Sequence, residues 1–465
     1  MVMINAVSAE HWAVIVAGST GYSNYRHQSD ACHAYHVVRR HGIPAENVVL
    51  MMYDDVAWHE SNPYPGQLFN RPAPEHVSHV TEQSVVDDVY KGCNIDFRGE
   101  DVTPEMFVNV LTGNRSGALK HKKVLASHAD DRVFVNFVDH GSRGNVYFPH
   151  MKPLSAAKLK QAMQTMYDTH MYKELVLYME ACESGSMFSD RFLKRINAFV
   201  TTAANGFESS WATYCPPLDE VHGKSIGSCL GDMYSVNWME DSDLTDLSGE
   251  TLTTQFHRVK NETAKSHVKA FGSSKLSHEI VGNYQSTYDK GANDVESSSE
   301  DTSDPRLNTA TTDVSLAHKS AVDARDVDLV VAFYRYLRAA PGNSRHECAA
   351  ELTAAIAARE AADKVFETIR ALYEQQTKVP LVQVEEAENV ECHEQVTRAF
   401  EVHCAFMGGL SSYSLKYAGT FLDLCESELT VSAAVAVVRE ACAVTKRPGF
   451  VPTSGVVDTN VVTLS

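Results

Sequence analysis

Short apolar runs alternate with amphipathic stretches throughout the first half of the chain. Buried strands are predicted for His11–Ala17, Asn47–Tyr53, Arg132–Val138, Glu174–Met179 and Ala198–Thr202. Helices are predicted for Asp30–His41, Pro104–Leu111 and Ser155–Tyr167. Strands that are apolar throughout and alternate with helices indicate a mostly parallel sheet that helices cover on both faces.

The pattern changes in the second half of the chain. Asp289–Asp313 is rich in Ser, Thr, Asp and Asn and nearly lacks apolar residues, so it predicts an exposed linker. From about Asp326 onward, apolar residues recur at helical spacing with no strand alternation, which predicts a helical bundle. We therefore expect an α/β domain at residues 1–280, a linker at 281–325 and a helical domain at 326–465.

Charge and hydropathy exclude several classes of protein. The formal net charge of −19 argues against binding to nucleic acid or to anionic membranes, which require basic patches. No stretch reaches the roughly 18 consecutive apolar residues of a membrane span. Met1–Glu10 lacks both a basic start and a long apolar stretch, so no signal peptide is visible.

The cysteines favour an oxidising compartment. The chain has 10 cysteines, and two N-glycosylation sequons begin at Asn114 and Asn261. Clustered cysteines in an acidic chain with sequons are typical of the secretory route, so we expect that a natural signal sequence precedes this chain. The alternative is a cytosolic protein with reduced thiols.

Two predicted strands end in residues that can react. Asp139-His140-Gly141 follows one strand, and Glu180-Ala181-Cys182-Glu183 ends another. The carboxyl ends of parallel strands line the crevice where ligands bind, so His140 and Cys182 are expected at one rim as a Cys-His pair for nucleophilic catalysis. Gly141 and Cys182 can offer backbone N–H groups to an oxyanion. The alternative is that Cys182 is a core residue and His140 bonds a loop.

Longer motifs carry a family resemblance. They are Asn24-Tyr25-Arg26-His27-Gln28, Asp30-Ala31-Cys32-His33-Ala34-Tyr35, Met51-Met52-Tyr53-Asp54-Asp55, Gly99-Glu100-Asp101-Val102-Thr103-Pro104, Asp139-His140-Gly141-Ser142, Glu180-Ala181-Cys182-Glu183-Ser184-Gly185-Ser186-Met187, Thr201-Thr202-Ala203-Ala204-Asn205 and Val236-Asn237-Trp238-Met239-Glu240-Asp241-Ser242. The chain resembles the legumains, also called asparaginyl endopeptidases or vacuolar processing enzymes. The likeness is close over His11–Ser266 and looser over Asp326–Cys442, and the Cys215–Cys229 loop with Pro216-Pro217 is similar to plant members.

The resemblance implies a fold and a set of roles. It implies a caspase-like α/β/α sandwich followed by an all-α, death-domain-like prodomain that caps and inhibits the site. Cys182 would be the nucleophile and His140 its partner, with Asn24 orienting His140. Asp139 matches a position that relatives can convert to a succinimide. No metal and no cofactor are expected.

The resemblance also implies a pocket for the residue before the cut. This pocket would consist of Arg26, His27, Glu180, Ser209 and Asp232. An asparagine side chain offers one carbonyl and one NH₂ group, which suit donation by Arg26 and acceptance by Glu180 and Asp232. Aspartate, with a free pKa of about 3.9, should fit only when it is protonated, so its cleavage should be favoured by acid.

The late cysteines and the linker complete the expected precursor. The four cysteines of the helical domain allow three pairings. The resemblance selects Cys392–Cys425 and Cys404–Cys442, and it closes Cys215–Cys229 as a third disulfide. It places the activating self-cleavage after Asp323, although Asn293, Asn308 and Asp313 are also allowed residues. Ala212 leaves peptide ligation open beside hydrolysis, and the expected destination is a lysosome, a vacuole or the exterior.

Two other functions compete with this one. The first is a glycosylphosphatidylinositol transamidase-like subunit, which shares the Cys-His chemistry. The absence of a predicted membrane span and the four-cysteine helical domain count against it. The second is an inactive scaffold that binds partners through its helical bundle, against which the complete set of Cys182, His140 and pocket residues counts.

Overall fold

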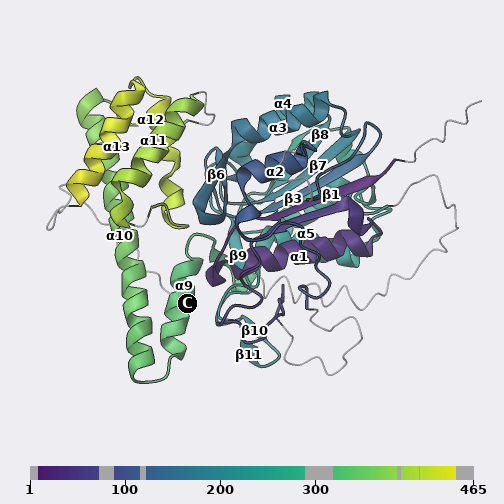
Figure 1. Cartoon of the computed structure of the whole chain (residues 1–465), viewed down its shortest axis with the longest axis horizontal. Helices are drawn as coiled ribbons and strands as arrows, with labels where there is room; N and C mark the ends of the chain where they lie inside the picture. The colour runs from purple at the N-terminus through teal and green to yellow at the C-terminus, as the bar shows by residue number, and fades with distance from the viewer. Residues whose placement is uncertain are drawn as a thin grey trace, which may run out of the picture. The chain divides into compact units, whose positions relative to one another are not determined.

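The computed structural model describes residues 9–72, 88–115, 122–287, 318–384, 389–407 and 409–446. The chain forms two compact units, Met1–Ala355 and Ile356–Ser465 (Figure 1). The boundary between these units falls later than residue 326, where the helical domain is predicted to begin. The linker boundaries predicted at residues 280 and 325 stay predictions.

A six-stranded sheet forms the centre of the first unit. Its strands are β1 (His11–Ala17), β2 (Val48–Met52), β3 (Arg132–Val138), β7 (Glu174–Glu180), β8 (Ala198–Thr202) and β13 (Lys269–Gly272). Their order is β13-β8-β7-β3-β1-β2, and all neighbours are parallel except β13, which pairs antiparallel with β8. β1, β2, β7 and β8 are buried along their whole length, which explains why the apolar runs predicted them.

Helices cover both faces of this sheet (Figure 1). One layer contains α1 (Tyr25–Arg40), α5 (Met233–Leu244), α6 (Leu252–Glu262) and α7 (Gly282–Gln285). The other contains α2 (Pro104–Leu111), α3 (Ala156–Asp168) and α4 (Asp190–Arg195). Alternate residues of β1 join the two cores, with Ala13 and Ile15 in one and Val14 and Val16 in the other. The predicted α/β/α sandwich with a mostly parallel sheet is confirmed.

Helix starts follow local chemistry, with one exception. Thr103 caps α2 by accepting a hydrogen bond from the Met106 N–H at 3.1 Å, and Ser155 caps α3. The exception is the first helix of the chain. The prediction that it starts at Asp30 is wrong, because α1 begins at Tyr25. The first turn of α1 is polar yet buried, and buried polar residues interrupt the amphipathic pattern on which the prediction depended.

Smaller elements surround the carboxyl edge of the large sheet. One small sheet contains β4 (Gly141–Ser142), β5 (Asn145–Phe148) and β6 (Lys152–Ser155). A second contains β12 (Gly231–Asp232), β9 (Trp211–Thr213) and β14 (Val322–Asp323), and β10 (Glu220–Val221) pairs with β11 (Lys224–Ser225). Short 3₁₀ helices include η1 (Tyr22–Asn24), η2 (Ala45–Asn47), η4 (Gly99–Asp101), η6 (Pro149–Met151), η7 (Ser184–Met187) and η8 (Leu276–His278). The helix α9 (Val327–Arg338) also belongs to the first unit.

The second unit is helical, as predicted. α10 (Asn343–Thr377) runs into it from the first unit, and α11 (Val390–His403), η9 (Ala405–Met407), η10 (Ser414–Tyr417), α12 (Gly419–Cys425) and α13 (Val431–Thr445) follow. Its aromatic core stacks Phe366 against Phe400 and Tyr417, with ring centroids 5.2 and 4.9 Å apart. No helix in the described ranges is long and apolar enough to cross a lipid bilayer.

Four disulfides tie these elements together. Cys392–Cys425 and Cys404–Cys442 are present in the second unit, and these are the pairings that the resemblance implied. Cys215–Cys229 closes the loop between β9 and β12. Cys32–Cys93 was not predicted, because nothing in the spacing of two cysteines 61 residues apart indicates that they meet. It joins α1 to the loop that precedes Phe97, and Cys182 remains a free, buried thiol.

Candidate active site

His140 and Cys182 lie at one rim because the strands before them are paired in register. Val138 of β3 lies opposite Glu180 of β7, and the Asp139 N–H donates to the Glu180 carbonyl at 3.0 Å. A side chain added at Gly141 would overlap the carbonyl oxygen of Cys182, so only glycine permits this close approach. The sequence prediction that these two strand ends meet is therefore in agreement with the structure.

Asn24 holds the imidazole of His140. Its side-chain oxygen lies 2.9 Å from His140 Nε2, and its own amide donates to the Thr20 carbonyl at 2.9 Å. Because an amide oxygen can only accept, His140 Nε2 carries the proton and Nδ1 is left able to accept one. Asn24 ends η1, so the turn before α1 fixes the tautomer of a histidine that follows β3.

The thiol of Cys182 is held by Ser210. The Ser210 N–H donates to Sγ at 3.3 Å, and the Ser210 hydroxyl lies 3.6 Å from it. Burial raises the pKa of the Cys182 thiol. Burial and the nearby Arg26 guanidinium lower the pKa of His140 to about 3. Cys182 is therefore a neutral thiol and His140 a neutral imidazole, which can accept a proton as a general base.

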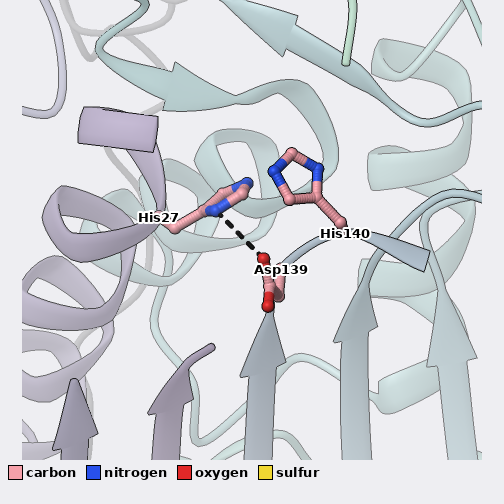
Figure 2. A group of neighbouring side chains, drawn as sticks. All are labelled: His27, Asp139 and His140. Carbon is pink, nitrogen blue, oxygen red and sulfur yellow. Dashed lines mark ion pairs between the residues drawn. The ribbon is translucent and has the colours of Figure 1, made fainter. Parts of the chain in front are cut away.

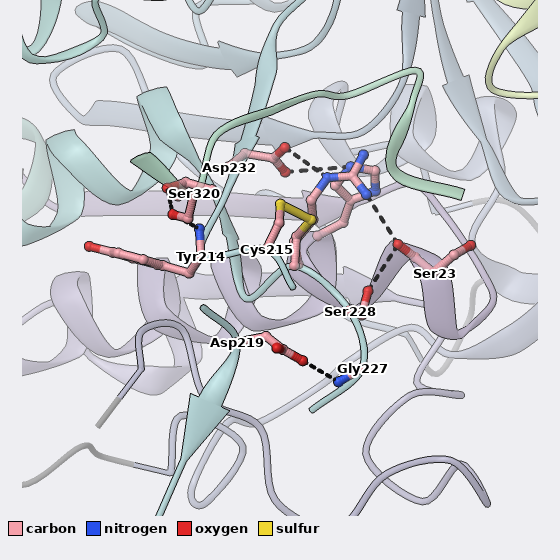
Figure 3. The surroundings of a disulfide bond; sticks show 12 residues. Ser23, Tyr214, Cys215, Asp219, Gly227, Ser228, Asp232 and Ser320 are labelled. Atoms are coloured by element: carbon pink, nitrogen blue, oxygen red, sulfur yellow. Dashed lines mark hydrogen bonds and ion pairs between the residues drawn. A yellow bond between two sulfur atoms is a disulfide. The ribbon is translucent and has the colours of Figure 1, made fainter. Parts of the chain in front are cut away.

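A buried ion pair lies at the base of the predicted pocket. Arg26 Nε donates to Asp232 Oδ1 at 2.8 Å, and Asp232 lies beside the loop that Cys215–Cys229 closes (Figure 3). Asp30, which the sequence did not single out, accepts a bond from the Asp232 N–H at 3.0 Å. Glu180 accepts from the backbone and hydroxyl of Ser235 at 3.0 and 3.1 Å.

Three polar atoms of this pocket have no hydrogen-bond partner among the described residues. They are Arg26 Nη2, Glu180 Oε1 and Asp232 Oδ2, and all are buried. Buried polar atoms are almost always bonded, so an unmatched set at one place indicates a ligand. One donor and two acceptors match a carboxamide, whose oxygen accepts once here and whose NH₂ donates twice.

Burial also sets the charge of these carboxyl groups. It raises the pKa of Glu180 well above its ordinary value, and the neighbouring Asp232 adds to the rise. The pKa of Asp232 is raised by burial as well, although Arg26 opposes this. The pocket therefore holds less negative charge than its residue types imply, and acid reduces that charge further.

His27 connects the pocket to the dyad. Its Nδ1 lies 2.6 Å from the Ser19 hydroxyl, and its Nε2 lies 3.5 Å from Asp232 Oδ2. Figure 2 shows its contact with Asp139, whose Oδ1 lies 3.4 Å from Nδ1. Ligand atoms of His27, Asp139 and His140 lie within 4.8 Å of one another, the one such group in the described part of the chain. Hydrogen bonds to Ser19 and Asn24 already engage one nitrogen of each ring. Burial raises the pKa of Asp139 well above its usual range, which favours its neutral acid.

Residues 318–338, here called the cover segment, lie across this rim. Val322 and Asp323 form β14, which pairs antiparallel with Ala212 and Trp211 of β9. Burial raises the pKa of Asp323, whose side chain is hydrogen-bonded to Ser209 of the predicted pocket. Figure 3 shows Ser320 bonded to the Tyr214 N–H, at 2.8 Å, beside the disulfide.

The rest of the cover segment is held by charge and by apolar contacts. Arg325 Nη2 lies 3.1 Å from Glu183 Oε2 and 3.5 Å from the Gly141 carbonyl. Val327 and Val331 of α9 pack in one cluster with the Cys215–Cys229 disulfide. The partners Arg325 and Glu183 were missed, since they are far apart in sequence. The position of Glu183 directly after Cys182 was the available signal.

Two sequence profiles and several relatives match this chain. Residues 11–287 match the sequence profile of the Peptidase C13 family, and residues 350–442 match that of the legumain prodomain. Vacuolar-processing enzyme delta-isozyme of Arabidopsis thaliana is 35% identical over 451 residues, which cover 93% of this chain and 90% of that protein. Legumain of Rattus norvegicus is 37% identical over 424 residues, which cover 90% of this chain and 89% of that protein.

One solved structure is also similar at low level. A caspase-1 from Spodoptera frugiperda matches with a TM-score of 0.31 and 9% identity, over 57% of this chain and 90% of that chain. A similarity of this size carries no argument about fold or function. The family match covers the dyad, the pocket and the sheet that positions both. The chain therefore belongs to the peptidase C13 family and is a cysteine-type endopeptidase that carries a legumain prodomain.

Proposed function

We propose that this chain is the latent precursor of an endopeptidase that cuts after asparagine, with Cys182 as nucleophile and His140 as acid–base partner. The observation that carries this proposal is the unmatched set of Arg26 Nη2, Glu180 Oε1 and Asp232 Oδ2. An asparagine side chain satisfies all three atoms at once. Glutamine places the same group one methylene deeper, and lysine would bring a second cation to Arg26.

The chemistry follows from the dyad. His140 Nδ1 takes the thiol proton of Cys182 as Sγ attacks the main-chain carbonyl carbon of the asparagine. The N–H groups of Gly141 and Cys182 stabilise the oxyanion, and His140 then donates the proton to the leaving amine. Water hydrolyses the thioester, with His140 as base, and restores the thiol. An amine in place of water would give ligation, which the small Ala212 beside the cleft leaves sterically open.

Acid should extend the specificity to aspartate. The ionised side chain of aspartate would face the carboxyl groups of Glu180 and Asp232, whereas the protonated side chain resembles asparagine in charge and size. The raised pKa of Glu180 acts in the same direction, since acid removes its charge as well.

Latency follows from the cover segment together with the prodomain. We propose that maturation cuts after Asp323, which lies in β14 against the wall of the cleft. Because burial raises the pKa of Asp323, its neutral form is reached at milder acidity than for a free aspartate. The other allowed residues, Asn293, Asn308 and Asp313, lie outside the described residues. The vacuolar names of the plant relatives support an acidic destination, and the prodomain match favours a legumain over a transamidase-like subunit.

Reporter cleavage tests this proposal. Reporter peptides that differ only in the residue before the cut, which is Asn, Asp, Gln or Lys, are assayed at about pH 5. The enzyme is the full chain, used before and after incubation in acid. We expect cleavage of the Asn peptide only after acid incubation, with no turnover of Gln or Lys. Equal turnover of Asn and Gln would contradict the pocket, and full activity before acid incubation would contradict latency.

A further inference from the structure

Glu183 is a carboxylate beside the nucleophile for which the dyad mechanism has no use. It follows Cys182 directly, and its backbone takes the left-handed conformation with φ of 54°. Its N–H donates to the Glu208 carbonyl at 2.8 Å, so the residue is fixed at the rim of the site. The residue is 8% exposed, and Oε2 has Arg325 as its charged partner at 3.1 Å.

The path of the cover segment shows on which side of the nucleophile this carboxylate lies. The Ala324 N–H donates to the Ser210 carbonyl at 3.1 Å, while the Ser210 N–H donates to Cys182 Sγ at 3.3 Å. The backbone of Ser210 thus contacts both the nucleophile and the peptide that joins Asp323 to Ala324. Arg325 is the second residue after Asp323, and it reaches Glu183 and the Gly141 carbonyl.

We propose that Glu183, together with the carbonyl of Gly141, forms a subsite that prefers arginine as the second residue after the cut. This proposal rests on the proposed function, since it takes the bond after Asp323 as the one that is cut. Arg325 occupies the subsite in the precursor, and substrates with arginine at the same position occupy it in the mature enzyme. Glu183 is then a specificity-determining residue on the leaving side of the scissile bond.

Two physical arguments favour arginine over other residues. Glu183 Oε2 is buried without a hydrogen bond of good geometry, and its charged partner at 3.1 Å is the Arg325 guanidinium. Losing that cation would leave a buried, unpaired carboxylate oxygen, which is costly. The planar guanidinium can donate to the carboxylate and the Gly141 carbonyl at once, whereas a lysine ammonium is a single point charge. Burial raises the pKa of Glu183, and the nearby Arg325 and Arg143 oppose this rise, so Arg143 still favours the ionised carboxylate after Arg325 has left.

The test is a set of peptides on the acid-matured enzyme. All carry Ala-Ala-Asn before the cut, and the second residue after it is Arg, Lys, Gln, Leu or Glu. The kcat/KM values are compared within each enzyme, so a general loss of activity cancels. We expect the order Arg, Lys, then Gln and Leu, then Glu, with roughly a tenfold span between Arg and Leu.

Variants locate the preference. Glu183→Gln should bring the Arg-to-Leu ratio to about one, and Glu183→Arg should invert the preference towards Glu. Glu100→Gln is the matched control, because Glu100 is an exposed glutamate that contacts His150, and it should keep the wild-type ratio. If Glu183→Gln does not fold, Glu183→Asp should keep part of the preference.

Outcomes separate this subsite from the proposed function. If no Asn peptide is cleaved at all, the proposed function fails. If Asn peptides are cleaved equally whatever follows, or if the arginine preference persists in Glu183→Gln, the subsite is wrong and the Asn specificity stands. Two further peptides carry the arginine at the first or the third position after the cut, and a preference for either of them would show that the cover segment does not mark the scissile bond.

Discussion

Two buried arginines face buried carboxylates at this site, and they differ in what holds them. Arg26 lies on α1 within the sandwich, is fully buried and is paired with Asp232. Arg325 lies on the cover segment, is 8% exposed and is paired with Glu183. Nη2 of Arg26 has no hydrogen-bond partner among the described residues, whereas the described contacts of Arg325 Nη2 are with Glu183 and Gly141.

This difference separates recognition from closure. A permanent pair with an unmatched donor cannot be satisfied by the protein itself, so it keeps a place for substrate. The pair of Glu183 with Arg325 joins a fixed carboxylate to a segment that can be cut away, so it lasts only until that segment leaves. The same interaction type therefore serves binding in one wall of the cleft and latency in the other. Substitutions in and around these two pairs test the division between binding by Arg26 and latency through Arg325.

The largest effect should come from substitutions of the dyad itself. Cys182→Ala removes the nucleophile and should abolish peptidase activity and self-maturation, while circular dichroism and the melting temperature stay close to wild type. His140→Ala should lose about 10²–10⁴-fold in kcat. Cutting of purified Cys182→Ala at acid pH without added enzyme would contradict self-processing, and measurable turnover by it would contradict the nucleophile.

Arg26→Lys should have the next largest effect. Lysine keeps the charge but loses the planar fork that joins Asp232 to the substrate carbonyl. Losing a charged hydrogen bond in a buried site costs about 1.5–3 kcal/mol, so kcat/KM for Asn peptides should fall by roughly ten- to hundredfold. Arg325→Lys is the matched control in the mature enzyme, from which this residue has been cut away, and it should leave kcat/KM unchanged.

The pH dependence of specificity should have an effect of similar or smaller size. Above its pKa of about 3.9, the neutral fraction of a substrate aspartate falls about tenfold per pH unit. The ratio of Asp to Asn cleavage should therefore rise as pH falls. Glu180 adds to this slope, because the pKa of its carboxyl is raised by burial and acid neutralises it too. Glu180→Gln should make the ratio less dependent on pH, and a ratio that rises with pH would contradict the pocket.

The two arginines also show how far the sequence could be interpreted. Five of the six strands of the large sheet were predicted within a residue because they are largely apolar, whereas the edge strand β13 was missed. His140 and Cys182 were located because each follows one of the predicted strands. Arg26 came only from the family motif, since it lies in the polar first turn that hid the start of α1. Arg325 and Glu183 were missed, because no periodicity reports a pair between a loop after β7 and a segment about 140 residues later.

The same limit applied to Asp30 and to Cys32. The sequence predicts a helix start at Asp30, whereas Asp30 lies inside α1. Its carboxylate accepts hydrogen bonds from the Asn70 amide and the Asp232 N–H. Its role depends on α1 packing against β12, a tertiary contact that local propensity does not contain. Cys32 pairs with Cys93 for the same reason. Local pattern therefore predicted the scaffold and the reacting ends, whereas the charges that select and exclude substrate required the packed structure.

Arg325→Ala should have the smallest effect and is the sharpest test of closure. It removes the ion pair to Glu183 and the contact with the Gly141 carbonyl, but it leaves β14 pairing, the Val327 and Val331 contacts and the bond of Arg338 to Asp219 at 3.1 Å. The cover segment should therefore stay docked but open more often, and acid maturation should be faster by a few-fold, since the contacts of one guanidinium among several are lost. The measurement is the rate of appearance of the mature band at several pH values, together with hydrolysis of a small Asn reporter by the uncut precursor.

Arg335→Ala is the matched control, because Arg335 lies on the same segment but pairs with Glu351 with half its side chain exposed, and it should mature at the wild-type rate. Equal rates for Arg325→Ala and wild type would mean that apolar contact and strand pairing alone hold the cover segment, and the division between the two arginines would be wrong.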